Sequence, residues 1–140
     1  MIVLEITSTF QSIPKVESFL KLFFEKYQIA LLICRRIELC IIEAINNSIL
    51  YGNKKDPQKI IKITISKNKQ KIIITTEDEG KGFDFNSIPD PISPENLMKE
   101  TGRGLYIITT LTDELYFAKN GAKIIMCFSL TNHKEENQFN

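Results

Sequence analysis

Four features of this sequence have residue types and a spacing that suit metal and phosphate chemistry. They are a carboxylate, a carboxamide and two glycine clusters. Glu43 and Asn47 are four residues apart, so on a helix they lie one turn apart on one face. Two clusters follow, Asp78-Glu-Gly-Lys-Gly82 and Gly102-Arg-Gly-Leu105. Amide and carboxylate oxygens suit Mg²⁺, and glycines expose backbone N–H groups to phosphates and leave room for a base. This ordered set indicates ATP binding beside a carboxylate placed for catalysis.

The two helical residues each have a purely structural alternative. Glu43 lies among apolar neighbours, where a charged carboxylate is costly unless it is paired or functional. The alternative is a helix-surface glutamate that pairs with a nearby lysine. Asn47 is either a neutral oxygen ligand for Mg²⁺, which takes few protein ligands, or a local hydrogen-bonding residue near a helix end.

The first glycine cluster follows a strand. Asp78 can accept a hydrogen bond from the adenine amino group, which would make the site specific for that base. Gly80 and Gly82 let the chain turn and leave space for a flat ring. The alternative is an ordinary turn after a strand.

The second glycine cluster precedes a predicted helix. Backbone N–H groups of Gly102 and Gly104 at a helix N-terminus would form an anion site, to which Arg103 adds a charge-assisted contact. The alternative is a flexible hinge with an exposed arginine.

The elements that must position these residues follow from the periodicity of the apolar side chains. A cap at Ser12 and a proline in the first turn mark the first helix, and Gly52-Asn53 ends the second. Proline-rich residues 85–101 are expected to form a lid. We predict strands at 2–7, 59–66, 71–76, 114–118 and 123–130, and helices at 12–27, 32–51 and 102–112. This order predicts an α+β fold, a two-layer sandwich of a mainly antiparallel mixed sheet packed against helices.

Length and composition narrow the function classes. The 140 residues suit one domain, and the net charge of +1 gives no general attraction to nucleic acid or to an anionic membrane. Cys34, Cys40 and Cys127 have no metal-binding spacing and are expected to be reduced core residues of a cytoplasmic protein. No apolar run is long enough to span a bilayer, and neither GxGxxG nor GxxxxGK[ST] is present. His133, the one histidine, is not expected to be catalytic.

Taken together, the motifs resemble those of the GHKL-type ATP-binding superfamily, the histidine kinase-like ATPases. That superfamily has ExxxN on a helix, DxGxG after a strand and GxG before a helix. The matching residues here are Glu43-Ala-Ile-Asn-Asn47, Asp78-Glu-Gly-Lys-Gly82 and Gly102-Arg-Gly104-Leu. The resemblance covers nearly the whole chain. It implies a GHKL-type ATPase domain over residues 1–131 and a polar C-terminal tail over residues 132–140.

Within that superfamily the sequence is most similar to the small anti-sigma-factor serine/threonine kinases of bacteria, in the runs EAINNSILYGN, DEGKGFD and GRGLYII. The resemblance implies a homodimer that binds ATP with Mg²⁺ and phosphorylates a serine or threonine of an anti-sigma-factor antagonist. It also implies that the protein sequesters a sigma factor in the absence of that antagonist. No direct binding to nucleic acid or membrane is expected.

The resemblance also implies a role for each motif residue. Glu43 would be the catalytic base, Asn47 the Mg²⁺ ligand and Asp78 the residue that reads adenine. The other residues implied in nucleotide binding are Gly80, Gly82, Gly102, Arg103, Gly104 and Leu105.

The sequence departs from the family pattern at two positions, and three other functions are compared with the kinase. Ala122 stands where related proteins often have threonine, so a hydroxyl that helps to hold the nucleotide is missing, and Tyr51 stands where histidine is common. A nucleotide-responsive binding module without kinase activity is therefore the main alternative. A small ATPase would need a partner domain to position water. Histidine kinases usually carry asparagine where Glu43 stands and need a preceding helical hairpin, so they fit less well.

Overall fold

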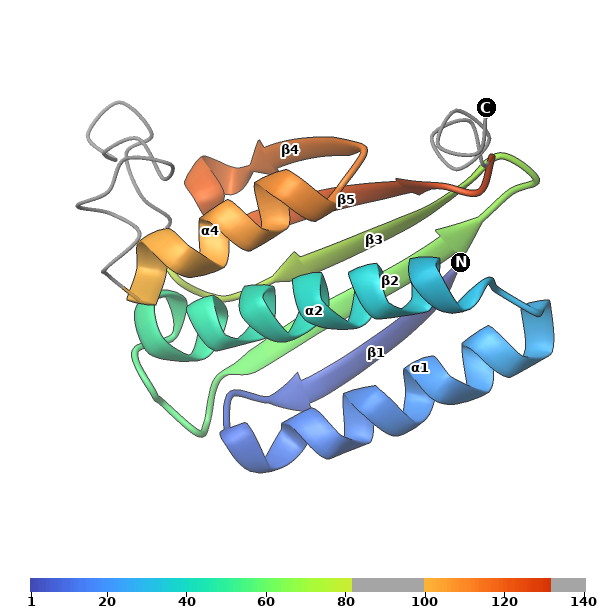
Figure 1. Ribbon diagram of the computed structural model, residues 1–140. Coiled ribbons are helices and arrows are strands. Elements are labelled where there is room, and N and C mark those ends of the chain that lie inside the picture. Colours follow the sequence, from blue (N-terminus) through green and yellow to red (C-terminus); the bar gives the residue numbers. More distant parts are fainter. Residues whose placement is uncertain (82–99, 132–140) are drawn as a thin grey trace.

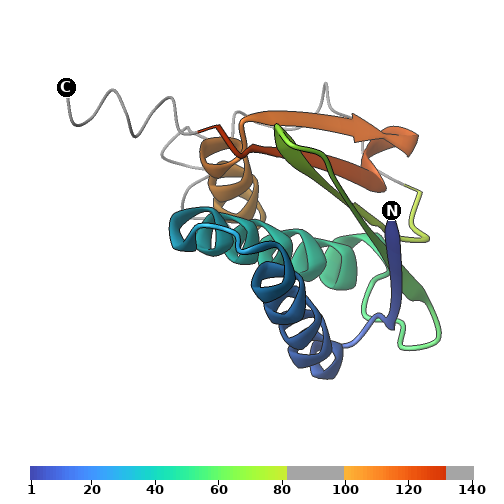
Figure 2. The ribbon, with the colours of Figure 1, turned by 90° about the vertical axis from the view of Figure 1, so that its right-hand side faces the viewer.

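The protein is a two-layer α+β sandwich in the computed structural model, which describes residues 1–81 and 100–131 (Figures 1 and 2). Helices α1, α2 and α4 cover one face of a single sheet (Figure 1). The strands are β1 (Ile2–Thr7), β2 (Ile60–Lys67), β3 (Lys71–Glu77), β4 (Glu114–Ala118) and β5 (Lys123–Ser129). The helices are α1 (Ile13–Tyr27), α2 (Leu31–Asn47) and α4 (Glu100–Leu111), with short helical turns η1 (Phe10–Ser12), η2 (Ser48–Gly52) and η4 (Lys119–Gly121).

The sheet has the strand order β1-β2-β3-β5-β4, and all four described pairings are antiparallel. Ile72 and Ile74 of β3 sit between Lys67 and Ile65 of β2 on one side and Phe128 and Met126 of β5 on the other. The predicted fold class is confirmed, because hairpins join β2 to β3 and β4 to β5. The described residues contain no parallel pair.

The core lies between the sheet and the helices. Alternate strand residues point to the helix layer, and they are almost all isoleucine, which suits a pleated, half-buried surface. From the helix side, Leu20, Ile37 and Ile41 are fully buried against them. The apolar strand side chains that are at most 1% exposed are Ile61, Ile63, Ile65, Ile72, Ile74, Met126 and Phe128. On the helix-free face the hydroxyls of Thr64 and Thr75 pair across the strands.

The start of α1 differs from the prediction in one respect. Ser12 occupies the N-cap position and Pro14 stands in the first turn, as expected, but Ser12 makes no capping hydrogen bond. Its hydroxyl instead bonds the hydroxyl of Thr7 at 2.7 Å and that of Thr9 at 3.0 Å. The predicted side-chain cap was therefore wrong. The Thr7 and Thr9 hydroxyls lie close to Ser12 Oγ and bond it in place of the backbone N–H groups of α1.

Two helix boundaries also differ from the prediction. The α-helical part of α2 ends at Asn47 rather than near Tyr51, and the chain continues as the π-helical turn η2. Helix α4 begins at Glu100, two residues before the predicted start at Gly102. The predicted lid, the glycine at position 82 and the tail at 132–140 fall wholly or mainly outside the described residues.

Helix α2 packs against the sheet between α1 and α4 (Figure 1). Its exposed side nevertheless carries Leu31, Leu32 and Leu39, so it is less completely buried than its apolar sequence predicts. Among the described residues, no helix has both the length and the apolar character needed to cross a membrane.

Candidate functional site

The end of α2 brings the first and third motifs together at Gly104. A Cβ atom built on Gly104 would lie 2.9 Å from Glu43 Oε2, 3.4 Å from Asn47 Nδ2 and 3.5 Å from Asn47 Oδ1. Both side chains of the ExxxN motif therefore face one point on α4, as their spacing of one helical turn requires. Gly104 is buried in this contact, and any larger residue would displace the Glu43 carboxylate.

The second motif joins the same end of α2 through Asp78. Ser48, the residue after Asn47, donates a side-chain hydrogen bond to the Asp78 carboxylate. The Gly80 N–H donates to Asp78 Oδ1 at 2.7 Å. A Cβ built on Gly52 would lie 2.3 Å from Asp78 Oδ2, and one built on Gly80 would lie 2.4 Å from the Gly52 carbonyl oxygen. The two glycines thus allow the backbone to close tightly around the carboxylate.

Asn53 holds the loop that carries Asp78. This side chain is fully buried. Its Oδ1 accepts a hydrogen bond from the Glu79 N–H at 2.8 Å, and its Nδ2 donates to the Ile60 carbonyl at 3.0 Å. Glu79 Oε2 accepts from the Ile60 N–H at 2.6 Å and completes the link. The turn after α2, the start of β2 and the Asp78 loop are therefore tied into one unit.

Burial controls the protonation of two groups at the site. It raises the pKa of Asp78, and the hydrogen bonds from Gly80 and Ser48 partly oppose that shift. Burial, together with the charge of Glu43, raises the pKa of the Cys40 thiol to about 12. Cys40 is therefore a neutral core residue one turn before Glu43, and it offers no thiolate for chemistry.

The glycine cluster of α4 lies inside the first turn of the helix and not before it. The N–H groups of the first turn of a helix have no partner within it, and Gly102 lies in the first turn of α4, so its N–H points along the axis toward the N-terminal end of the helix. The Arg103 side chain is exposed, and Leu105 is buried on the side of the core. This arrangement suits an anion placed next to Glu43 and Asn47.

The donor set at this site fits a nucleotide with Mg²⁺. Asn47 offers a neutral oxygen, Asp78 offers a half-buried acceptor, and glycine at position 104 leaves the Glu43 carboxylate and the Asn47 amide in place beside α4. Within residues 1–81 and 100–131, no group of three or more His, Cys, Asp or Glu side chains could hold a metal ion alone. A Mg²⁺ ion at Asn47 would therefore need phosphate oxygens and water as its other ligands.

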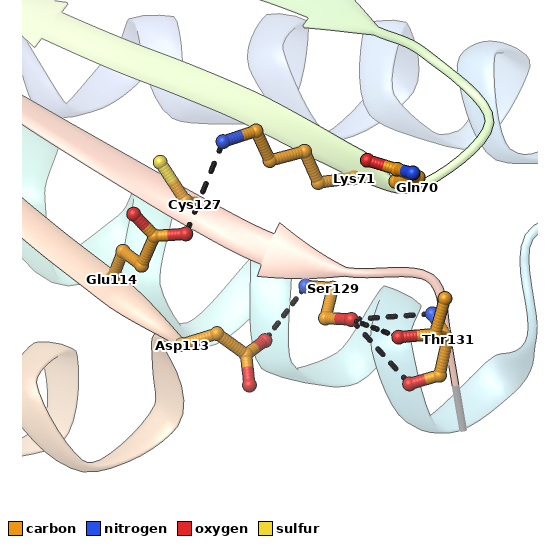
Figure 3. A pocket seen from close by; sticks show the side chains of 7 residues that line it. All are labelled: Gln70, Lys71, Asp113, Glu114, Cys127, Ser129 and Thr131. Atoms are coloured by element: carbon orange, nitrogen blue, oxygen red, sulfur yellow. Dashed lines mark hydrogen bonds and ion pairs between the residues drawn. The ribbon is translucent and has the colours of Figure 1, made fainter. Parts of the chain in front are cut away.

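A separate hollow of about 350 Å³ lies on the helix-free face of the sheet (Figure 3). Figure 3 shows Lys71 directed at Glu114, 3.9 Å away, and Asp113 accepting from the Ser129 N–H. The residues that line the hollow are Gln70, Lys71, Asp113, Glu114, Cys127, Ser129 and Thr131. None belongs to the three motifs, so this hollow is not the candidate site.

Sequence reasoning missed the residues that join the motifs. Gly52-Asn53 was interpreted only as a helix stop, although it meets Asp78 and its loop. Ser48 was not singled out, and its place directly after the ExxxN motif was the available signal. The cysteines at 34, 40 and 127 are free and buried, as predicted.

Comparison with known proteins is consistent with this geometry. Residues 6–128 match the family model described as the Histidine kinase-like ATPase domain. The chain is 29% identical over 111 residues to the serine-protein kinase RsbW of Bacillus cereus (strain B4264), covering 74% of this chain and 69% of that protein. Proteins of the same name from Bacillus anthracis and Bacillus thuringiensis (strain Al Hakam) are equally similar, at 29% identity.

A solved structure shares the fold. The crystal structure of the RsbU and RsbW domains of a Mycobacterium tuberculosis protein superposes with a TM-score of 0.56 at 11% identity. The match covers 92% of this chain and 32% of that chain, so this protein spans about a third of that larger one.

Proposed function

The chain belongs to the histidine kinase-like ATPase domain family, and from this premise we propose that it is an ATP-dependent serine/threonine protein kinase that acts as an anti-sigma factor. In this proposal it phosphorylates an anti-sigma-factor antagonist and otherwise sequesters a sigma factor. The observation that carries the proposal is the approach of Glu43 and Asn47 to Gly104, next to the Ser48 contact with Asp78. The relatives named serine-protein kinase support the choice of reaction.

Each motif residue has one task in the proposed reaction. Asn47 contributes an oxygen ligand to Mg²⁺, and Asp78 accepts a hydrogen bond from the adenine amino group. The Gly102 N–H binds a phosphate oxygen, and Arg103 adds a charge-assisted contact. Glu43 accepts the proton of the attacking hydroxyl and orients it. When bound, ATP supplies the phosphoryl group and Mg²⁺ neutralises the charge on the phosphates. The protein's main contribution is therefore to position the reacting groups and to stabilise charge.

One observation favours the alternative, a nucleotide-responsive binding module without kinase activity. The backbone N–H of Asp78 donates to the Ala122 carbonyl at 2.9 Å, so residue 122 lies beside the backbone of Asp78. Ala122 is 5% exposed and has no hydroxyl to offer a nucleotide there. Weaker ATP binding would leave partner binding as the main activity.

The decisive experiment measures ATP binding and phosphoryl transfer on the same preparation. Partners are first captured from the native cell, with and without ATP. Calorimetric titration with Mg·ATP should show saturable binding that weakens in Asn47→Ala, and labelled phosphate should pass to a serine or threonine of one captured partner. Binding without transfer to any partner would favour the binding module. No binding of any nucleotide would refute both functions.

Partners and assembly complete the proposal. The antagonist, the sigma factor and a homodimer are expected from the family resemblance, as is a cytoplasmic location. Sedimentation equilibrium on the purified chain tests the homodimer, because a monomer at micromolar concentration would contradict it.

A further inference from the structure

Two leucines are exposed on the outer side of α2, the side turned away from the core. Leu32 is 54% exposed and Leu39 is 51% exposed. Arg35 lies between them, three residues after Leu32 and four before Leu39, and it is exposed as well. Residues at this spacing share one face of a helix, so the three side chains form a continuous row along α2. We call Leu32, Arg35 and Leu39 the α2 outer row.

The spacing of the α2 outer row distinguishes it from a single exposed leucine. Helix α2 lies in front of the sheet between α1 and α4 (Figure 1), and Ile37 and Ile41 on its inner side are fully buried. On α1, Leu22 is 67% exposed, but Ser18 and Lys26 lie one turn before and after it. Isolated apolar side chains of that kind are ordinary on a protein surface. Leucines seven residues apart instead have the spacing with which one helix packs along another.

The charge of Arg35 defines what could cover the row. Within residues 1–81 and 100–131 the ion pairs join Lys71 to Glu114 and Lys119 to Glu77, so Arg35 has no acidic partner in this part of the chain. An occupant that covers both leucines also removes water from the guanidinium between them. A charge that loses water is unfavourable unless it is paired. The occupant must therefore bring apolar side chains for the leucines and a carboxylate for Arg35.

A second copy of the chain does not meet this requirement. A two-fold axis through the row brings the Arg35 side chains of both copies close together, because Arg35 lies near the midpoint between the leucines. Like charges in such a contact repel. An anionic membrane fits poorly as well, because α2 contains two arginines and two glutamates, whereas helices that bind membrane surfaces are rich in basic residues. A helix of another protein satisfies both the apolar and the acidic requirement.

We propose that the α2 outer row is a docking surface for an amphipathic helix of a partner protein, which carries two apolar side chains seven residues apart and an acidic side chain between them. The partner helix lies along α2, its apolar side chains cover Leu32 and Leu39, and its carboxylate pairs with Arg35. This inference goes beyond the proposed function, because it requires neither nucleotide nor phosphoryl transfer. Leu39 precedes Glu43 by one helical turn, so the docked helix lies next to the candidate site.

A displayed library of helical peptides, varied on one face, tests the chemistry of the partner. The library is selected on the wild-type protein after peptides that bind Leu39→Gln have been removed. The selected peptides should carry two apolar residues seven positions apart with aspartate or glutamate between them. Leu32→Gln takes no part in the selection, so it gives an independent check. The affinity of a selected peptide, measured by fluorescence anisotropy, should fall about tenfold or more in this variant, because one buried leucine contact is lost.

Charge reversal and a matched control complete the test. Arg35→Glu should weaken binding of the selected peptide about tenfold or more, and a peptide with lysine in place of its acidic residue should bind this variant better than it binds wild type. Leu22→Gln removes an exposed leucine from α1 and should bind the selected peptide as wild type does. All the substituted side chains are exposed, so each variant should melt within a few degrees of wild type.

Three results would overturn the inference. A selection that yields no peptide dependent on Leu39, or only peptides without an acidic residue between the apolar ones, would show that the row does not recognise an acidic helix. A wild-type dimer that becomes a monomer in Leu39→Gln, measured by sedimentation, would identify a second copy as the occupant. Binding to phosphatidylglycerol vesicles that is lost in Arg35→Glu would identify a membrane instead. Because the experiments use no nucleotide, their outcome is independent of the test of the proposed function.

Discussion

The Glu43 carboxylate lies at the tightest contact between α2 and α4. Its Oε2 atom would be 2.9 Å from a Cβ on Gly104, and its charge contributes to the raised pKa of Cys40. These contacts place the carboxylate beside both Asn47 and the first turn of α4. In the proposed reaction, a base in this position reaches the hydroxyl that attacks the phosphate.

Glu43→Gln keeps the size of the side chain and removes its basicity. We expect Mg·ATP binding to stay near that of wild type and phosphoryl transfer to fall by about 10²-fold or more, the lower range of general-base contributions. Labelled-phosphate transfer and calorimetry on the same variant provide the measurement. Glu38→Gln, five residues earlier on α2, is the control. Equal transfer by Glu43→Gln and wild type would show that Glu43 is not the base.

Asp78 is a residue at which stability and function are expected to oppose one another. Burial raises its pKa in the folded protein. A carboxyl group with a raised pKa adds stability that is fully present below its unfolded pKa and is lost as the pH rises through the folded pKa. At neutral pH the free protein therefore carries the cost of a half-buried charge, and in the proposed function the adenine amino group gives that charge a further hydrogen bond.

Asp78→Asn should remove this contribution to the pH dependence of stability. Between acid and neutral pH, the unfolding free energy of the variant should rise relative to wild type, because asparagine has no charge to desolvate. Mg·ATP affinity should fall, since the amide presents donors where the adenine amino group needs an acceptor. Urea unfolding from pH 4 to pH 7 measures the first effect. A stability difference that does not change with pH would contradict it.

At the scale of elements, the contact between α2 and α4 depends on a glycine. Alanine at position 104 should favour the helix by about 1 kcal/mol, but its Cβ would force the Glu43 carboxylate to move. The end of a flexible side chain moves easily, so folding stability should change little. The displaced atom, Glu43 Oε2, belongs to the candidate site, so the substitution should affect function much more than folding stability.

Gly104→Ala should therefore keep its melting temperature within a few degrees of wild type and lose about tenfold or more in Mg·ATP affinity, by analogy with the cost of overpacking. Thermal unfolding and titration on one sample give both values. Thr110→Ala, on the exposed side of α4, is the control for the helix itself. Normal ATP binding by Gly104→Ala would argue against a nucleotide site at this contact.

At the scale of the whole molecule, the cysteines report on the integrity of both faces of the sheet. Cys34 and Cys40 belong to the core between helices and sheet, and Cys127 lines the hollow on the opposite face. All three are free and buried, and burial raises the pKa of each thiol, that of Cys40 to about 12. The thiolate is the reactive form, so the folded protein should react slowly with thiol reagents.

A thiol-reactive dye at pH 8 tests this expectation. The native protein should label slowly, and urea should release three reactive thiols in a transition that coincides with the loss of helical circular dichroism. Cys40→Ala should reduce the number of thiols labelled in urea to two, and the labelling phase that disappears identifies Cys40. Rapid labelling of Cys40 without urea would contradict the buried environment described here.

The order of elements could be predicted from sequence because it depends on local patterns. Alternating isoleucines predicted the hairpin of β2 and β3 within one residue, and helical spacing predicted α1 and the shared face of Glu43 and Asn47. The order of these strands and helices then predicted the fold class, which the structure confirms. These features involve residues that are close in the chain, where backbone geometry alone decides which side chains share a face.

Only the tertiary structure decided how the motifs meet. Ser48 reaches Asp78, and Asn53 holds Glu79, because the turn after α2 packs against the end of β3. The missing cap at Ser12 also depends on a neighbour from another segment. The sequence pattern shows the periodicity of apolar residues within each helix or strand, but it does not show how far apart two elements lie in the folded protein. Packing of the core sets that distance, and with it the arrangement of the site.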